Sequence, residues 1–320
     1  MENLSVTNVN KFVWSETYRP ANVDDLIATE EVRKIVEGII QKGDIPNMLL
    51  VGRSGIGKTT IARMLCESIG ADYIIINASL KGNIDTLRNE ILQFASTVSF
   101  KGGRKYVILD EADGLNPQHT QPALRNFMDT YVQNCGFILT ANHLNKIIPA
   151  LLDRVSVEHF NIKKADHPKL AITFLKRCEH ILEAESIPYD REALGRYIIA
   201  HTPNFRSILN ALQKYAVTHG KIDAGILAAD SIVPLSSLIP HIKAGDYVEV
   251  RKWVSLNIDN DISDIFTGLY DTLTPIVTSD TAGDLVIILA RYQYQAAFVV
   301  DQQINLAAAL VEVMVNCQFK

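Results

Sequence analysis

The segment VGRSGIGKTT, residues 51–60, carries residue types that could bind phosphate groups. It fits the pattern G-x-x-x-x-G-K-[ST], with Gly52, Gly57, Lys58 and Thr59 at the fixed positions. Glycines allow backbone N–H groups to fold around phosphates, and the N-terminus of a following helix adds positive potential. We expect Lys58 to reach the β- and γ-phosphates of a nucleotide, and the Thr59 hydroxyl to ligate Mg²⁺. A chance glycine loop is the alternative, but the motif follows an apolar run and opens a helical pattern, as a phosphate loop requires.

Two acids end another apolar run, in the segment YVILDEAD at residues 106–113. Asp110 stands at the carboxyl end of the run, where an acid can face Mg²⁺, and Glu111 can polarise an attacking water as general base. The segment LTANH ends the next run with Thr140 and Asn142, where a polar side chain would hydrogen-bond that water beside the γ-phosphate. An asparagine after a strand is more often a turn residue. Beside an intact phosphate loop, these residues predict hydrolysis of a nucleotide.

Apolar runs alternate with helical patterns through the first half of the chain. The runs are typical of buried strands and lie at 47–52, 73–77, 106–110, 136–140 and 155–160. The helical patterns lie at about 58–69, 85–98, 117–133 and 146–153. This alternation predicts an α/β fold with a five-stranded parallel sheet covered on both faces.

Beyond residue 160 the hydrophobic period is helical only. The polar segment 161–168 ends in a proline and predicts a hinge, and Asn204 is a candidate N-cap of a later helix. Segment 233–241 holds two prolines and marks a second break, with about four helices after it. We therefore expect an α/β domain over 1–162, a small helical domain over 163–232 and a terminal helical domain over 233–320.

Composition and charge limit the classes of function. Of 320 residues, 48% are hydrophobic and 21% charged, which is ordinary for a soluble globular protein, and no apolar stretch approaches the length of a membrane span. The start has no apolar core like that of a signal peptide, so we expect a cytoplasmic protein without a membrane partner. Residues 231–320 hold five basic and ten acidic residues, and the rest is neutral, so DNA contacts would come from local clusters in the first 230 residues. Four cysteines are scattered and predict reduced, packed thiols: Cys66, Cys135, Cys178 and Cys317.

Taken together, the motifs resemble those of AAA+ ATPases, and more narrowly the ATPase subunits of replication factor C type sliding-clamp loaders. The chain looks closest to the large subunits of T-even-like bacteriophage loaders. The letters DEAD alone would suggest an RNA helicase, but a helicase would need a second motor domain, and the chain after 160 is helical. The resemblance covers the whole chain, more weakly after 230, and is carried by ETYRP (16–20), INAS (76–79), DEAD (110–113), QPALRNFMD (121–129) and NFR (204–206).

The resemblance implies roles for further residues. The adenine pocket would be lined by Ser15, Glu16, Thr17, Tyr18 and Ile27, with Pro20 fixing the approach of that segment. The phosphate loop would contribute Gly52, Gly55, Ile56, Gly57, Lys58, Thr59 and Thr60. Asn77 would hold Glu111 in check until DNA binds, and Arg206, from the helical lid, would contact the γ-phosphate of its own chain. The alternative for Arg206 is an exposed helix arginine.

Arg154 lies in the otherwise apolar segment LLDRVSV. The resemblance implies that the chain presents this arginine to the ATP of the next subunit. The family's Ser-Arg-Cys is Asp153-Arg154-Val155 here, so Asp153 could partly neutralise the guanidinium. The alternative is a local salt bridge to Asp153 or Glu158.

The function implied is that of an ATP- and Mg²⁺-dependent ATPase in a clamp loader, in the host bacterial cytoplasm if phage-encoded. Several copies and a distinct fifth subunit would assemble through the C-terminal collar, open a ring-shaped sliding clamp and place it on primer–template DNA for a replicative polymerase. DNA would trigger hydrolysis and release. Candidate DNA contacts are Lys81, Asn83, Arg88, Lys101, Arg104 and Arg125.

Two alternatives stay open at this point. One is another AAA+ DNA motor, such as a branch-migration helicase or an origin-binding initiator, which would be expected to carry a C-terminal winged helix. The acidic, all-helical end argues against that. The other is a scaffold subunit that does not hydrolyse ATP, and intact Lys58, Asp110, Glu111 and Arg154 argue against it.

Overall fold

The computed structural model describes residues 13–79, 84–99, 102–160, 162–229, 235–258 and 262–320. The chain forms two compact units, Met1–Leu227 and Ala228–Lys320. Among the described helices, none combines the length and the apolar character needed to cross a bilayer. The predicted subdivision of the first unit near residue 162 stays a prediction.

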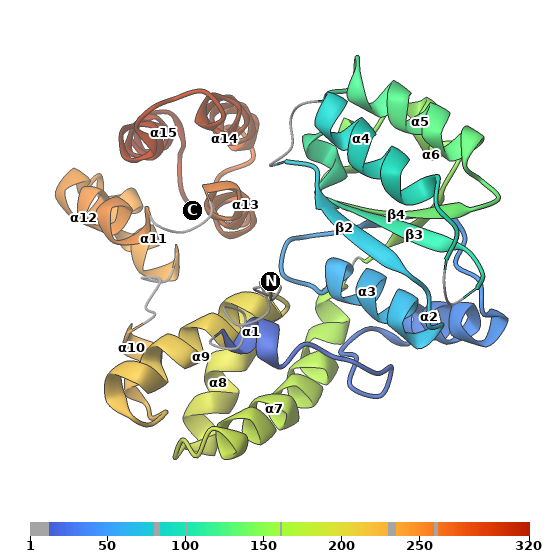
Figure 1. Cartoon of the computed structure of the whole chain (residues 1–320). Coiled ribbons are helices and arrows are strands. Elements are labelled where there is room, and N and C mark those ends of the chain that lie inside the picture. The colour runs from blue at the N-terminus through green and yellow to red at the C-terminus, as the bar shows by residue number, and fades with distance from the viewer. Residues whose placement is uncertain (1–12, 80–83, 100–101, 161, 230–234, 259–261) are drawn as a thin grey trace. The chain divides into compact units, whose positions relative to one another are not determined.

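A five-stranded sheet forms the centre of the first unit (Figure 1). Its strands are β1 (Met48–Val51), β2 (Tyr73–Asn77), β3 (Lys105–Asp110), β4 (Cys135–Ala141) and β5 (Ser156–His159). All pairs are parallel, in the order β2-β3-β4-β1-β5. The predicted parallel sheet is therefore confirmed.

Helices cover both faces of this sheet, because side chains alternate along each strand. On one face Leu49 and Leu109 pack against α4 (Ile84–Ala95), α5 (Thr120–Thr130) and α6 (Pro149–Leu152). On the other, Leu50 and Ile108 pack against α2 (Glu30–Lys42) and α3 (Lys58–Ser68). Figure 1 shows these two sets of helices on opposite sides of the strands.

The helix predicted at about 146–153 is present but shorter, as α6. A 3₁₀ turn at Leu144–Lys146 is followed by extended backbone at Ile147 and Ile148, and α6 begins only at Pro149. Proline lacks the N–H that a helix interior needs, so it is tolerated in the first turn only. The freed Ile148 N–H donates instead to Oε1 of the buried Gln121 at 2.8 Å.

Two helices near the start of the described chain were not predicted. They are α1 (Trp14–Thr17) and α2, which has clear end signals: Thr29 as N-cap and Gly43 in the left-handed conformation at its end. Trp14 packs in the helical core beyond the sheet, and its backbone N–H donates to Gln213 Oε1 at 3.0 Å. The N-terminal segment is thereby attached to the helices that follow the sheet in the chain, which we call the lid helices.

The lid helices complete the first unit. They are α7 (His167–Ala184), α8 (Arg191–His201), α9 (Phe205–His219) and α10 (Gly225–Ala229). The Asn204 carboxamide accepts a hydrogen bond from Ser207 N–H at 3.2 Å, which confirms the predicted N-cap of α9. Arg177 of α7 donates to Asp25 at 2.8 Å and to the Tyr18 carbonyl at 3.0 Å. The lid is thus attached to the segment that precedes α2.

The second unit consists of helices around one apolar core. They are α11 (Leu235–Ala244), α12 (Tyr247–Asn257), α13 (Ile262–Leu273), α14 (Ala282–Ala296) and α15 (Gln302–Asn316). Buried residues from every helix, such as Trp253 and Leu310, form that core. The all-helical character expected after residue 233 is confirmed for the described residues.

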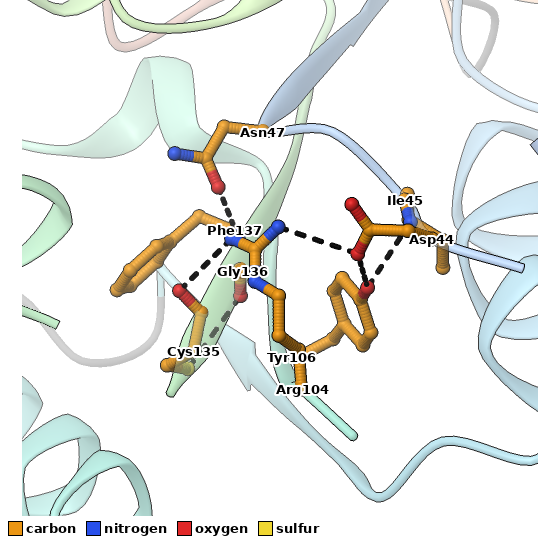
Figure 2. Close-up of polar contacts among 8 residues, drawn as sticks. All are labelled: Asp44, Ile45, Asn47, Arg104, Tyr106, Cys135, Gly136 and Phe137. Carbon is orange, nitrogen blue, oxygen red and sulfur yellow. Dashed lines mark hydrogen bonds and ion pairs between the residues drawn. The ribbon is translucent and has the colours of Figure 1, made fainter. Parts of the chain in front are cut away.

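A polar cluster closes the amino-terminal edge of the sheet (Figure 2). The buried Tyr106 hydroxyl accepts from Ile45 N–H at 3.0 Å and donates to Asp44 at 2.8 Å. Burial raises the pKa of Tyr106 to about 12, so the hydroxyl remains a donor at neutral pH. The Arg104 guanidinium lies 5.8 Å from the Tyr106 ring centroid and donates to the Cys135 carbonyl at 3.4 Å.

These contacts bear on Arg104, which was a candidate DNA contact. Its Nη1 lies 3.4 Å from the Asp44 carboxylate, and its side chain is largely covered. The structure therefore gives Arg104 a packing role that needs no nucleic acid.

All four cysteines are buried free thiols.

Replacing Tyr106 by Phe should leave the buried Ile45 N–H without its partner. An unpaired buried donor costs about 1–3 kcal/mol, so we expect the free energy of unfolding to fall by that amount. Denaturant unfolding measures it. Tyr131→Phe is the control, because the Tyr131 ring stacks on Phe127 and its hydroxyl makes no hydrogen bond with the described residues. Equal stability of the two variants would contradict the role given to the Tyr106 hydroxyl.

Candidate active site

The loop after β1 closes around the side chain of Lys58. The Lys58 ammonium donates to the carbonyls of Gly52 (2.7 Å) and Arg53 (2.8 Å) and to Asn142 Oδ1 (2.8 Å). Gly57 has φ 98°, a left-handed conformation that favours glycine, and α3 begins at the next residue. The loop and the helix N-terminus are therefore arranged around a cation, as a phosphate site requires.

Gly55 connects this loop with the lid. It has φ 79°, and a Cβ built there would lie 2.1 Å from Oδ1 of Asn204, the N-cap of α9. Only glycine allows this close approach. The lid residue Arg206, two positions beyond that cap, lines the same pocket as Lys58.

The Asp110 carboxylate accepts hydrogen bonds from two hydroxyl groups. Thr59 and Thr140 each donate to Asp110 Oδ1 at 2.6 Å, and the Thr140 hydroxyl accepts from Glu111 N–H at 3.1 Å. The described residues hold no cluster of three or more His, Cys, Asp or Glu side chains suited to a metal. Mg²⁺ bound with a nucleotide needs only one or two protein oxygen ligands beside phosphates and waters, and the Thr59–Asp110 pair fits that chemistry.

Glu111 stands in a strained conformation just beyond β3. Its backbone has φ 57° and ψ 45°, which is uncommon for a residue other than glycine. Asn77 ends the neighbouring strand β2, in register with Asp110, and its amide lies 3.5 Å from Glu111 Oε2. The strained turn brings the carboxylate towards the asparagine.

One pocket gathers most of the predicted site residues. They are Ser15, Tyr18, Ile27, Gly55, Ile56, Gly57, Lys58, Thr59, Thr60, Asp110, Glu111, Asn142 and Arg206. Glu16, Thr17, Gly52 and Arg154 do not line it. Glu16 instead accepts from Arg19 at 2.5 Å, and Gly52 contributes its carbonyl to Lys58.

Arg19 is a pocket residue that the sequence analysis missed. Its Nη2 donates to Glu16, while Nε and Nη1 are buried and find no hydrogen-bond partner among the described residues. A buried donor without a partner is costly, so an acceptor that reached these groups would be favoured. The signal was present in ETYRP, where we assigned a role to every residue except Arg19. Arg177, Phe174 and Phe205 also line the pocket and were not predicted.

Arg154 lies at the other edge of the sheet. It precedes β5, where Ser156 pairs with Met48 at the amino end of β1, whereas the phosphate loop follows the carboxyl end of β1. Its Nε contacts Asp129 Oδ1 and Oδ2 at 2.9 and 3.2 Å. The alternative of a local salt bridge named Asp153 or Glu158 as the partner, whereas the structure pairs Arg154 with Asp129 of α5.

The comparisons agree with this geometry. The sequence model of the AAA family, "ATPase family associated with various cellular activities", matches residues 48–161. The sliding-clamp-loader large subunit of Enterobacteria phage T4 is 33% identical over 225 residues, which cover 69% of this chain and 70% of that protein. Replication factor C subunit 5 of Homo sapiens is 31% identical over 284 residues, covering 87% and 77%. The chain belongs to the clamp-loader family of AAA ATPases.

Solved structures show the same fold. A single-residue variant of RuvB from Thermotoga maritima superposes on this clamp-loader ATPase with a TM-score of 0.52 and 17% identity, covering 66% of this chain and 71% of the other. Identity this low supports a shared fold and nothing about activity.

The Lys58 ammonium gives the nucleotide site a pH dependence. Burial lowers the pKa of Lys58 to about 8, whereas bound phosphates favour the charged form. ATP binding above pH 8 must therefore take up a proton, and we expect affinity to fall by up to about tenfold per pH unit there. Nucleotide titrations between pH 7.5 and 9.5 measure this. Lys58→Arg, which stays charged, should lose the dependence, and a flat profile in the unmodified protein would contradict the assignment.

Proposed function

We propose that this clamp-loader ATPase, with ATP bound, opens a ring-shaped sliding clamp and places it on primer–template DNA. DNA contact then triggers hydrolysis and release. One observation carries the proposal: the pocket holds Lys58, Asp110 and Glu111 together, while Arg154 lies beyond reach at the opposite edge of the sheet. A complete site in this proposal requires a second chain.

Several polar residues of the pocket are given roles in hydrolysis in this proposal. Lys58 exchanges its two carbonyl partners for phosphate oxygens. Asn142, whose Oδ1 accepts a hydrogen bond from Lys58, then turns to the attacking water. Glu111 accepts a proton from that water as the water oxygen attacks the γ-phosphorus, the bond from this phosphorus to the β–γ bridging oxygen breaks, and ADP leaves. Arg206 contacts the γ-phosphate from the lid, and the unpaired N–H groups of Arg19 bind acceptors of the nucleotide.

Mg²⁺ would be held by Thr59 and Asp110 and would neutralise charge on the β- and γ-phosphates. The hydroxyl and carboxylate already lie in contact, so both present oxygens to one point. Thr140 keeps Asp110 in place from β4. The protein's own part is to position these oxygens, one at the start of α3 and the other at the carboxyl end of β3.

The strand register excludes Arg154 from its own nucleotide. From Met48, opposite Ser156, to Gly52 the chain advances four residues along β1, about 13 Å at ~3.3 Å per residue. Arg154 stands two residues further away still. An arginine supplied to a phosphoryl transition state is worth ~10³–10⁵ in rate, which makes the ATP of a neighbouring subunit its fitting target.

The partners proposed are other copies of the chain, a distinct fifth loader subunit, the clamp and DNA, with the replicative polymerase acting afterwards. The helical collar of the second unit would hold the copies together. For DNA, Arg88 on α4 is exposed and Arg125 on α5 is partly so. Lys81, Asn83 and Lys101 lie outside the described residues. Phosphate contacts of this kind require no base sequence, as a loader needs.

Glu111→Gln and Lys58→Ala should separate chemistry from binding. Glu111→Gln removes the base and retains the phosphate contacts, so we expect ATP affinity within about twofold and a loss of turnover of at least about a hundredfold. Lys58→Ala should instead weaken ATP binding. Single-turnover rates and nucleotide titrations of the assembled protein distinguish the two. Near-normal hydrolysis by Glu111→Gln would remove this residue from the mechanism.

Arg154→Ala should leave ATP affinity of isolated chains unchanged and abolish DNA-stimulated hydrolysis in the assembly. Mixing Arg154→Ala chains with Glu111→Gln chains should restore part of the activity, because an intact Glu111 then meets an intact Arg154 across a subunit boundary. ATPase rates over a range of mixing ratios, with sedimentation to verify assembly, are the measurement. Mixtures that assemble but recover nothing would make Arg154 a structural salt-bridge residue.

A further inference from the structure

We propose that Asp129 is the positioning residue for Arg154. Asp129 stands near the end of α5, 25 residues before Arg154 in the chain, and both of its carboxylate oxygens contact the Arg154 Nε. The inference rests on the proposed role of Arg154 at the ATP of a neighbouring subunit. Asp129 acts through the arginine and is itself given no contact with the nucleotide.

The guanidinium of Arg154 is held from two elements at once. Asp129 of α5 holds Nε, and the Ala150 carbonyl of α6 accepts from Nη1 at 3.0 Å. Two fixed contacts on different nitrogens define both the position and the plane of the group. A free arginine loses side-chain entropy when it binds, and these contacts order the side chain before a nucleotide arrives.

The same contacts leave one edge of the guanidinium available. Nη2 makes no hydrogen bond with the described residues, and 28% of the Arg154 side chain is exposed. A guanidinium grips phosphate through parallel N–H groups, and the Nη1–Nη2 edge still has such groups to offer. The salt bridge therefore leaves N–H groups of Arg154 available for a phosphate, and a structural contact is compatible with a role at a neighbouring subunit.

Asp129 is also connected to its own helix. Its Oδ2 lies 3.9 Å from Nε of Arg125, one turn earlier on α5. This places the carboxylate between two guanidinium groups. Surface ion pairs contribute little to stability, so removing Asp129 should change the position of Arg154 far more than the stability of the fold.

The test compares Asp129→Asn with Asp129→Glu, Asp153→Asn and Arg154→Ala in the assembled loader with DNA and clamp. Asp153 is the matched control, an exposed acid adjacent to Arg154 without a salt bridge to it in the described structure. We expect Asp129→Asn to lower kcat by about ten- to a hundredfold, the scale of a misplacement near 1 Å, with KM within about twofold. Asp129→Glu should restore part of kcat and Asp153→Asn should be neutral. Asp129→Asn added to Arg154→Ala should cost nothing further.

Mixing experiments assign Asp129 to a side of the subunit boundary. Asp129→Asn chains should regain activity with Glu111→Gln chains and none with Arg154→Ala chains. Three outcomes would each overturn the positioning role while leaving the proposed function intact. They are recovery of activity in mixtures with Arg154→Ala chains, an Asp129→Asn assembly with unchanged kcat, and an Asp129→Asn variant that no longer assembles. An Arg154→Ala assembly with normal DNA-stimulated turnover would overturn both.

Discussion

All five strands of the sheet run in the same direction, and this constraint decides which residues can share a site. The carboxyl ends of β1, β3 and β4 meet at one edge, so the phosphate loop, Asp110 and Asn142 come together although they are far apart in sequence. The amino end of β5 lies at the other edge and carries Arg154 with it. The parallel sheet therefore places Arg154 and the pocket at opposite ends of the strands, and the proposal that Arg154 acts on the ATP of another chain starts from this separation.

At the carboxyl ends of the strands, the pocket gathers cationic groups whose partners come from the protein itself. Lys58 is bound to two loop carbonyls and Asn142, and its lowered pKa records the cost of burying that charge. Arg19 retains two buried N–H groups without partners among the described residues. A polyanion meets both needs at once, because phosphate oxygens stabilise the ammonium and offer acceptors. The site is thus built for a ligand whose charge its own residues do not balance.

The sequence predicted what local patterns encode and missed what tertiary contacts decide. The phosphate loop, the strand ends and the Asn204 cap each depend on neighbouring residues, and the structure has the parallel sheet and this cap where they were expected. The helix predicted at about 146–153 was too long, because the periodicity does not show that Pro149 must stand in the first turn. Asp129 could not be identified as the partner of Arg154, since only the packing of α5 on α6 brings them together.

The central claim is that the arginine of one chain completes the ATP site of another. A structure of the assembled loader with a non-hydrolysable ATP analogue tests it most directly. The account predicts the Nη1–Nη2 edge of Arg154 about 2.7–2.9 Å from the γ-phosphate in the neighbouring pocket, with Nε still on Asp129. Arg154 directed to solvent at every occupied interface, or bound to the nucleotide of its own chain, would contradict it.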